Sequence, residues 1–316
     1  MLARIADSLF WIGRYMERAE DTARMLDVHY YTLVERQSSS YKLRWEPIIR
    51  IAGEQDRFFQ FHPEADAESV FRYLAFSQDN PNSIRECVAR VRENARTIRE
   101  IISREMWEDV NGFYHEMKNF EPEEEVRGGP HRFCRRVIFA CHRFSGVSDG
   151  TLPHDEGWQF MRIGKFLERA EMTARIVNVQ YHNLVDKEGM EEFDDHQWMA
   201  VLKSAGAYQA YRRWHRSRIV PARVAEMLIL HPDHPRSVRF CFTQMQLALR
   251  DISGTMPGDY ANEAERLTGK VLESLRYHHI EEIFEKGLEG YLVELQNSCR
   301  AIGHQIARRY FYYSAA

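Results

Sequence analysis

The chain has 316 residues, of which 43 are Lys or Arg and 47 are Asp or Glu, so its formal net charge is −4, and 44% of its residues are hydrophobic. A chain of this length can bury a core of its own, which excludes a disordered tail, and the slightly acidic balance excludes the broad basic surface typical of nucleic-acid binding. Its low content of Gly and Pro, 17 and 10 residues, predicts an all-α protein.

Helical periodicity and capping residues predict helices along the whole chain, and no stretch shows the alternation of a strand. The predicted helices span 2–36, 45–53, 66–77, 83–118, 131–147, 155–187, 196–213, 221–230, 237–251, 262–279 and 282–311. The loops with the most turn chemistry are 121–130 and 253–259. The longest helices are expected to pack along one another in a bundle.

The sequence also predicts where the protein is found. Charges at Arg4 and Asp7 interrupt the start of the chain before a signal peptide could form, and no segment approaches the roughly 18 uncharged apolar residues of a membrane span. The five cysteines contain no C-x-x-C pair, so neither a disulfide framework nor a thiolate zinc site is indicated. We expect a cytoplasmic protein without a membrane span.

The two halves of the chain repeat each other. Residues 12–34 align without gaps on residues 163–185, and 13 of the 23 positions are identical. The match continues from SQDNPNSIREC at Ser77 to HPDHPRSVRFC at His231, where Ser83 and Ser237 are predicted to cap the next helix. We expect one helical body over 1–316 with internal pseudo-twofold symmetry, built from repeat 1 at about 1–148 and repeat 2 at about 149–316.

The repeated helix carries two stripes on a helical wheel. The apolar stripe has small residues at its centre, Ala19 and Ala23 in one copy and Ala170 and Ala174 in the other, which predict close approach by another helix. The second stripe is polar and is retained in full between the copies. It consists of Gly13, Glu17, Glu20 and Arg24, and of Gly164, Glu168, Glu171 and Arg175.

Retention of the polar stripe in both copies predicts that it is at least partly buried, because side chains on an open surface need not match. Buried carboxylates need partners, and the arginines of the stripe, with Arg18 and Arg169 nearby, can supply them. One interpretation is a Glu–Arg lattice that fixes helix register. The other is a polar cleft for a divalent cation, or for an amino acid or peptide. A di-iron site is disfavoured because no His follows a Glu by three residues, and we expect no metal and no cofactor.

The segments LFWIGRYMERAEDTAR and CHRFSGVSDGTLPHDEGWQFMRIGKFLERAEMTAR resemble the bacterial alpha-E domain proteins over essentially the whole chain. The resemblance implies an all-helical protein without an assigned activity. It also implies a genomic neighbourhood with a circularly permuted ATP-grasp ligase and a transglutaminase-like protease, and hence a system that makes, attaches or trims peptides through amide bonds.

Three other features were weighed beside the polar stripe. The string Gly146 to Gly150 satisfies G-x-S-x-G, but a helix precedes it, so we interpret it as a helix C-cap with a loop and not as a nucleophile elbow. Asp155 is predicted to cap the second repeated helix. If a functional cleft exists, His154 and His142 are expected at its mouth. Cys141 is predicted to be a core residue.

The terminal RRYFYY segment, 308–313, carries more apolar surface than a fraying helix end should, so either the body or a partner must cover it. Three functions follow from these patterns. The first is an accessory protein that binds a peptide or the ligase along the Glu/Arg stripe. The second is an enzyme that uses the four glutamates for acid–base or cation-assisted chemistry. The third is a structural scaffold, and the chain can be a monomer or a homo-oligomer in each.

Overall fold

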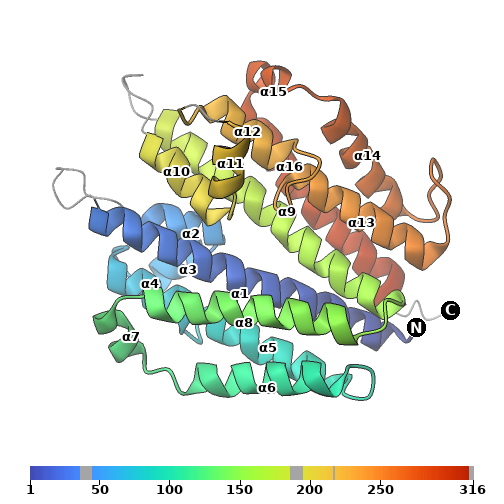
Figure 1. The fold of residues 1–316 in the computed structure, drawn as a ribbon, viewed down its shortest axis with the longest axis horizontal. Coiled ribbons are helices and arrows are strands. Elements are labelled where there is room, and N and C mark those ends of the chain that lie inside the picture. The colour runs from blue at the N-terminus through green and yellow to red at the C-terminus, as the bar shows by residue number, and fades with distance from the viewer. Residues whose placement is uncertain (36–44, 186–194, 216–217, 313–316) are drawn as a thin grey trace. The chain divides into compact units, whose positions relative to one another are not determined.

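The computed structural model describes residues 1–35, 45–185, 195–215 and 218–312 (Figure 1). Within these ranges the chain forms sixteen α-helices and one π-helical turn and has no strand, which confirms the all-α prediction. None of the helices in these ranges is both long and apolar enough to cross a lipid bilayer.

The chain divides into two compact units. The first unit is Tyr15–Leu152, and the second unit consists of Met1–Arg14 together with Pro153–Ala316. Helix α1, Ala3–Glu35, starts in the second unit and continues into the first. The first fourteen residues therefore belong to the same compact unit as residues 153–316, although the whole of the first unit separates them in the sequence.

The first unit contains the larger part of α1 and seven further helices among the described residues. These are α2 Glu46–Ala52, α3 Gln55–Phe61, α4 Ala67–Ala75, α5 Ile84–Thr97, α6 Arg104–Lys118, α7 Pro122–Gly128 and α8 His131–Thr151. Phe133 on α8 is fully buried, and its ring contacts those of Phe71, Phe76 and Phe120. This aromatic cluster joins α4, α8 and the segment that follows α6 in one core.

The second unit contains the start of α1 and the helices that follow residue 153. These are α9 Glu156–Val185, α10 Asp195–Ser204, α11 Tyr208–Trp214, α12 Pro221–Ile229, α13 Val238–Ser253, α14 Glu263–Tyr277, α15 Ile280–Lys286, α16 Leu288–Ile306 and the π-helical turn η1 Ala307–Phe311. Helix α9 packs against α13 and α16 (Figure 1). The RRYFYY segment is partly covered by this unit, because the Phe311 ring contacts Phe10 and Phe160 while Tyr312 remains exposed.

The helix pairs of the first unit recur in the second in the same order. In the first unit α2 contacts α3 and α4, and α4 contacts α5 and α7. Helix α6 contacts α5 and α8, and α7 also contacts α8. In the second unit α10 contacts α11 and α12, and α12 contacts α13 and α15. Helix α14 contacts α13 and α16, and α15 also contacts α16. The helices α2–α8 and α10–α16 thus follow the same sequence of neighbours in the two units.

Several predicted boundaries were wrong. The helix predicted over 83–118 is broken at 98–103, where Ser103 caps α6 by accepting from the Met106 N–H at 3.0 Å. The helix predicted over 196–213 is broken near Gly206, whose φ of 60° lies in the left-handed region. The loop predicted over 121–130 contains α7, and the helices predicted over 262–311 divide into α14, α15, α16 and η1.

Candidate functional site

Two helix backbones approach each other closely in the second unit, at the two glycines of the polar stripe. A Cβ placed on Gly13 would lie 2.2 Å from the Met161 carbonyl oxygen, and one on Gly164 would lie 2.0 Å from the Phe10 carbonyl oxygen. Both distances are far below any allowed contact, so only glycine fits at either position. The glycines of the stripe therefore serve a close crossing of α1 and α9.

In the second unit the glutamates of the stripe are buried and surrounded by arginines. Arg14 donates to Glu168 at 2.7 Å and to Glu171 at 3.1 Å, and Arg175 donates to Glu171 at 2.5 Å. The Nε of Arg300 on α16 lies 3.7 Å from the same Glu171 carboxylate. Glu171 is thus held by cations from three helices, which offsets the cost of removing its charge from water.

In the first unit the equivalent position is Glu20, whose side chain is only 5% exposed. Arg24 donates to it at 2.6 Å, and the Nε2 of His142 on α8 lies 3.1 Å from the same oxygen. Arg24 Nε is buried without a hydrogen-bond partner among the described residues. The glutamates of both stripes, including Glu17 at 3% exposed, are buried as predicted.

The last helix of each unit carries an exposed basic side chain to a buried carboxylate. The His142 side chain on α8 is 53% exposed, and that of Arg300 on α16 is 59% exposed. In both units a cysteine precedes this residue and is buried. Burial and the neighbouring Glu20 and Glu17 raise the pKa of the Cys141 thiol, so it is a core residue and not a nucleophile.

Arg18 and Arg169 each contact a turn of their own unit. The two turns, residues 79–83 and 233–237, share the sequence pattern D-x-P-x-S. Arg18 donates to the Asn82 side chain, and Arg169 donates to the Pro235 carbonyl oxygen at 3.2 Å. The turns themselves end as predicted, because Ser83 and Ser237 each accept a backbone N–H in the first turn of α5 and α13. These arginines therefore fix a turn against the repeated helix of each unit.

The loop before α9 has the predicted cap. Asp155 accepts from the Gly157 N–H at 2.8 Å, and the His154 ring stacks on Trp158 at a centroid distance of 3.8 Å. The G-x-S-x-G string does not form the predicted C-cap, because α8 continues to Thr151. Ser148 donates to the Phe144 carbonyl within this helix, at 2.8 Å. A serine inside a regular helix is not a nucleophile elbow.

Two partners of the glutamates, Arg14 and Arg300, were not found by sequence reasoning. Arg14 lies one residue after Gly13, so the helix crossing places it beside Glu168. The sequence reveals Arg300 as a partner of Glu171 only when α16 is aligned with α8. The signal that was present is the cysteine before each basic residue, Cys141 before His142 and Cys299 before Arg300.

The described residues contain no group of three or more His, Cys, Asp or Glu side chains placed to hold a metal ion. Three histidines of the second unit, His234, His278 and His279, have structural contacts. His279 caps α15 together with Glu282, and the His278 ring lies 3.1 Å from the Ser274 hydroxyl. His234 is 3% exposed in its turn, and burial lowers its pKa to about 4.

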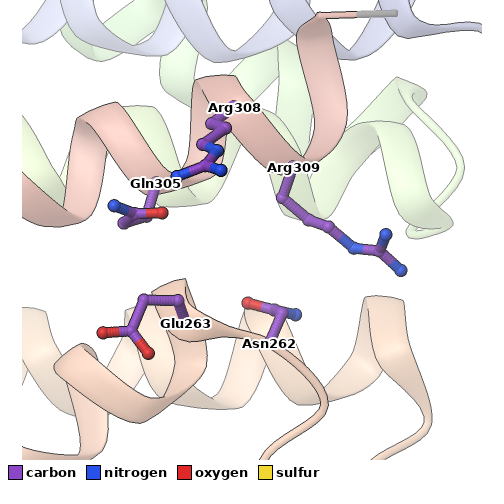
Figure 2. A pocket seen from close by; sticks show the side chains of 5 residues that line it. All are labelled: Asn262, Glu263, Gln305, Arg308 and Arg309. Atoms are coloured by element: carbon purple, nitrogen blue, oxygen red, sulfur yellow. The ribbon is translucent and has the colours of Figure 1, made fainter. Parts of the chain in front are cut away.

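A groove with a volume of about 530 Å³ lies in the second unit (Figure 2), and none of the residues that line it belongs to the glutamate stripe. Gln305, Arg308 and Arg309 form one wall, and Asn262 and Glu263 at the start of α14 form the other. None of these residues was predicted as a site residue. The only signal in the sequence was the RRYFYY segment, which was considered for its aromatic residues.

The chain belongs to the Alpha-E family, which it matches over residues 1–311 and which is described as a predicted alpha-helical domain with a conserved ER motif. The dipeptides Glu17-Arg18 and Glu168-Arg169 are the ER pairs of the two similar segments, 12–34 and 163–185. Each pair joins a buried carboxylate of the stripe to the arginine that holds the following turn.

Relatives at low identity are uncharacterised proteins. One from Mycobacterium bovis is 24% identical and one from Mycobacterium tuberculosis strain H37Rv is 23% identical, each over 92% of this chain and 34% of the relative. The chain therefore spans about a third of the length of the curated relatives it matches. No solved structure matches the chain.

Proposed function

We propose that this chain is a helical accessory protein of a bacterial ATP-grasp amide-ligase system, which binds a peptide or the ligase itself at the Glu/Arg sites of its two units. The observation that carries the proposal is the same in each unit. A buried carboxylate, Glu20 or Glu171, holds an exposed basic side chain of the last helix, His142 or Arg300. A basic group fixed in this way costs little further side-chain entropy when an acidic group of a partner binds it.

The length of the relatives supports a role beside another polypeptide. In those proteins the segment similar to this chain occupies 34% of the molecule, so it is joined covalently to further polypeptide. A domain that is joined to other polypeptide in its relatives fits an accessory role. The ligase as partner comes from the resemblance to the alpha-E proteins.

We also propose that the two units arose by internal duplication and are related by pseudo-twofold symmetry. The order of helix neighbours supports this, as does the reciprocal contact of Gly13 with Met161 and of Gly164 with Phe10. Phe10 and Gly13 correspond in the sequence repeat to Met161 and Gly164, so each glycine contacts the counterpart of the residue that the other glycine contacts. A twofold crossing of equivalent helices requires this reciprocity. A duplicated partner surface would follow from a duplicated fold.

An enzymatic role is the second candidate, and one observation favours it. A buried carboxylate 3.1 Å from an exposed imidazole, as in Glu20 and His142, is the arrangement that orients a general base. Replacement of His142 by Gln would abolish such an activity, whereas an accessory role would lose partner affinity only.

The test measures the unfolding midpoint of the wild type and of single variants, with and without the purified ATP-grasp ligase. His142→Gln and Arg300→Gln are expected to melt within about 2 °C of the wild type, because exposed pairs contribute little stability. They are expected to lose most of the shift that the ligase induces. Arg276→Gln, an exposed arginine on α14 paired only to Glu273, serves as the control. No shift in the wild type, with lower midpoints in the Glu20→Gln and Glu171→Gln variants, would support the scaffold instead.

A further inference from the structure

The C-terminal end of α16 and the turn η1 form a basic face in the second unit. From Asn297 to Tyr312 the sequence contains no acidic residue, while Arg300, His304 and Arg308 recur at intervals of four. Residues four apart lie on one side of a helix, about 6 Å apart along its axis. All three are exposed, so this face continues from the Glu171 site to the groove of Figure 2. We call Arg300, His304, Arg308 and Arg309 the α16 basic face.

The groove at the end of this face has free hydrogen-bond donors. Among the described residues no carboxylate pairs with Arg308 or Arg309, and Gln305 on the same wall has no hydrogen-bond partner. On the opposite wall Glu263 is bound by Arg266 through two hydrogen bonds, at 2.6 and 2.7 Å. Because Glu263 is already neutralised, the two arginines give the groove an excess of positive charge.

The two arginines are presented by a segment that is held in place. The π-helical turn η1 follows α16 directly. Such turns are rare in proteins, and those that occur are often found at functional sites. The Tyr310 hydroxyl accepts from the Asn262 side chain at 3.0 Å, and the Tyr310 and Phe311 rings pack on Phe160. A helix end would normally fray, but these contacts fix the backbone that carries Arg308 and Arg309.

We propose that the α16 basic face binds an acidic peptide, whose C-terminal carboxylate enters the groove between Arg308 and Arg309. The planar guanidinium groups match carboxylates in geometry, and the spacing of Arg300, His304 and Arg308 suits an extended peptide with further acidic side chains. This rests on the proposed function, because it names the peptide that the accessory protein would take. It goes beyond that proposal by assigning a site that the duplicated stripe does not contain.

The corresponding end of the first unit is closed. There the cap of α6, Ser103, contacts Thr151 at the end of α8 directly, with 2.7 Å between the two hydroxyl oxygens. The residues in this part of α8, from Gly146 to Thr151, include no arginine or lysine. The basic groove is therefore a property of the second unit alone among the described residues.

The experiment is fluorescence anisotropy of a fluorescein-labelled hexaglutamate peptide titrated with the full chain. The wild type is expected to bind, and the double variant Arg308→Gln/Arg309→Gln is expected to bind at least about tenfold more weakly. The control is Arg212→Gln/Arg213→Gln on α11, which removes the same charge from exposed arginines of the same unit and is expected to bind like the wild type. Both variants are expected to keep the circular dichroism melting curve of the wild type.

Two competitors separate the sources of the anion. Hexaglutamate with an amidated C-terminus is expected to compete more weakly than the free acid, and inorganic phosphate is expected to displace neither. Three results would each overturn the proposal. They are an equal loss of affinity in both double variants, no binding by the wild type, and displacement of the labelled peptide by phosphate at a lower concentration than by unlabelled hexaglutamate. If hexaglutamate fails while the ligase still shifts the unfolding midpoint, the accessory role stands and the peptide site does not.

Discussion

The buried glutamates Glu20 and Glu171 occupy the same place in the two repeated segments, but a different residue reaches each of them from the last helix of its unit. Glu171 contacts Arg14, Arg175 and Arg300, and Glu20 contacts Arg24 and the imidazole of His142. The carboxylate and its i+4 arginine are common to both sites. The comparison teaches that the pairing within the repeated helix is the shared feature, and that the residue on the last helix distinguishes the two sites.

The largest effect is expected where the two halves share a backbone contact. Gly164→Ala and Gly13→Ala would each force a methyl group against a carbonyl oxygen, and we expect each to cost about 3 kcal/mol or more of unfolding free energy. Because the contacts are reciprocal, the two costs should be similar. The measurement is urea unfolding followed by circular dichroism.

Gly146→Ala is the matched control for these variants. It adds the same methyl group in the middle of α8, where a Cβ would meet nothing within 4 Å. We expect it to stabilise the protein by up to about 1 kcal/mol, since alanine favours a helix over glycine. If Gly164→Ala were as stable as this control, the helix crossing would be wrong.

The second effect is expected at the two buried glutamates. Glu171→Gln removes the carboxylate that Arg175 and Arg300 contact and one of the two carboxylates that Arg14 contacts, and Glu20→Gln removes the carboxylate beside Arg24 and His142. We expect each variant to cost about 3 kcal/mol of unfolding free energy, as measured by chemical denaturation. Glu93→Gln, an exposed residue paired with Arg92 and Arg96, should change stability by less than about 0.5 kcal/mol. A cost as small as that of this control would show that the buried ion pairs add no stability.

The third effect is a pH dependence that His234 in the second unit causes. Burial, with help from His231, Arg236 and Arg169, lowers the pKa of His234 to about 4 from its usual 6.5. The unfolded chain therefore binds the proton more readily, so the stability contribution is complete above pH 6.5 and is lost as the pH falls toward 4, by about 3 kcal/mol.

Asn80 shows how to remove this dependence. It occupies the same position in the turn of the first unit, and its side chain accepts from the Asn82 N–H as His234 accepts from the Arg236 N–H. The variant His234→Asn is expected to keep the turn and to flatten the difference in unfolding free energy between pH 7 and pH 4.5. An unchanged pH profile would show that other groups cause the loss.

The smallest effect is expected from exchanging the residues of the last helices. His142→Arg makes the Glu20 site resemble the Glu171 site, and Arg300→His does the reverse. Each should change the unfolding free energy by less than about 1 kcal/mol at pH 7, because both side chains are more than half exposed. The measurement is urea unfolding of both exchange variants, and a cost well above about 1 kcal/mol would show that the last-helix residue is required for the stability of the site.

Much of the site could be predicted because it lies within single helices. The pairs Glu20–Arg24 and Glu171–Arg175 follow from a spacing of four, and their burial follows from retention of the stripe in both copies. The caps at Ser83, Ser237 and Asp155 were also predicted from local sequence. Local rules were sufficient in these cases because both partners lie within one or two helical turns.

The sequence by itself determined the helical class, the repeated segment and the buried glutamate stripe, because periodicity, capping and self-similarity are local properties of a chain. Only the tertiary structure decided the partners of the glutamates from other helices, the crossing at Gly13 and Gly164, and the groove beside Arg308. Each of these depends on two segments far apart in sequence meeting at a specific rotation, and that rotation is set by packing of the whole core and not by either segment.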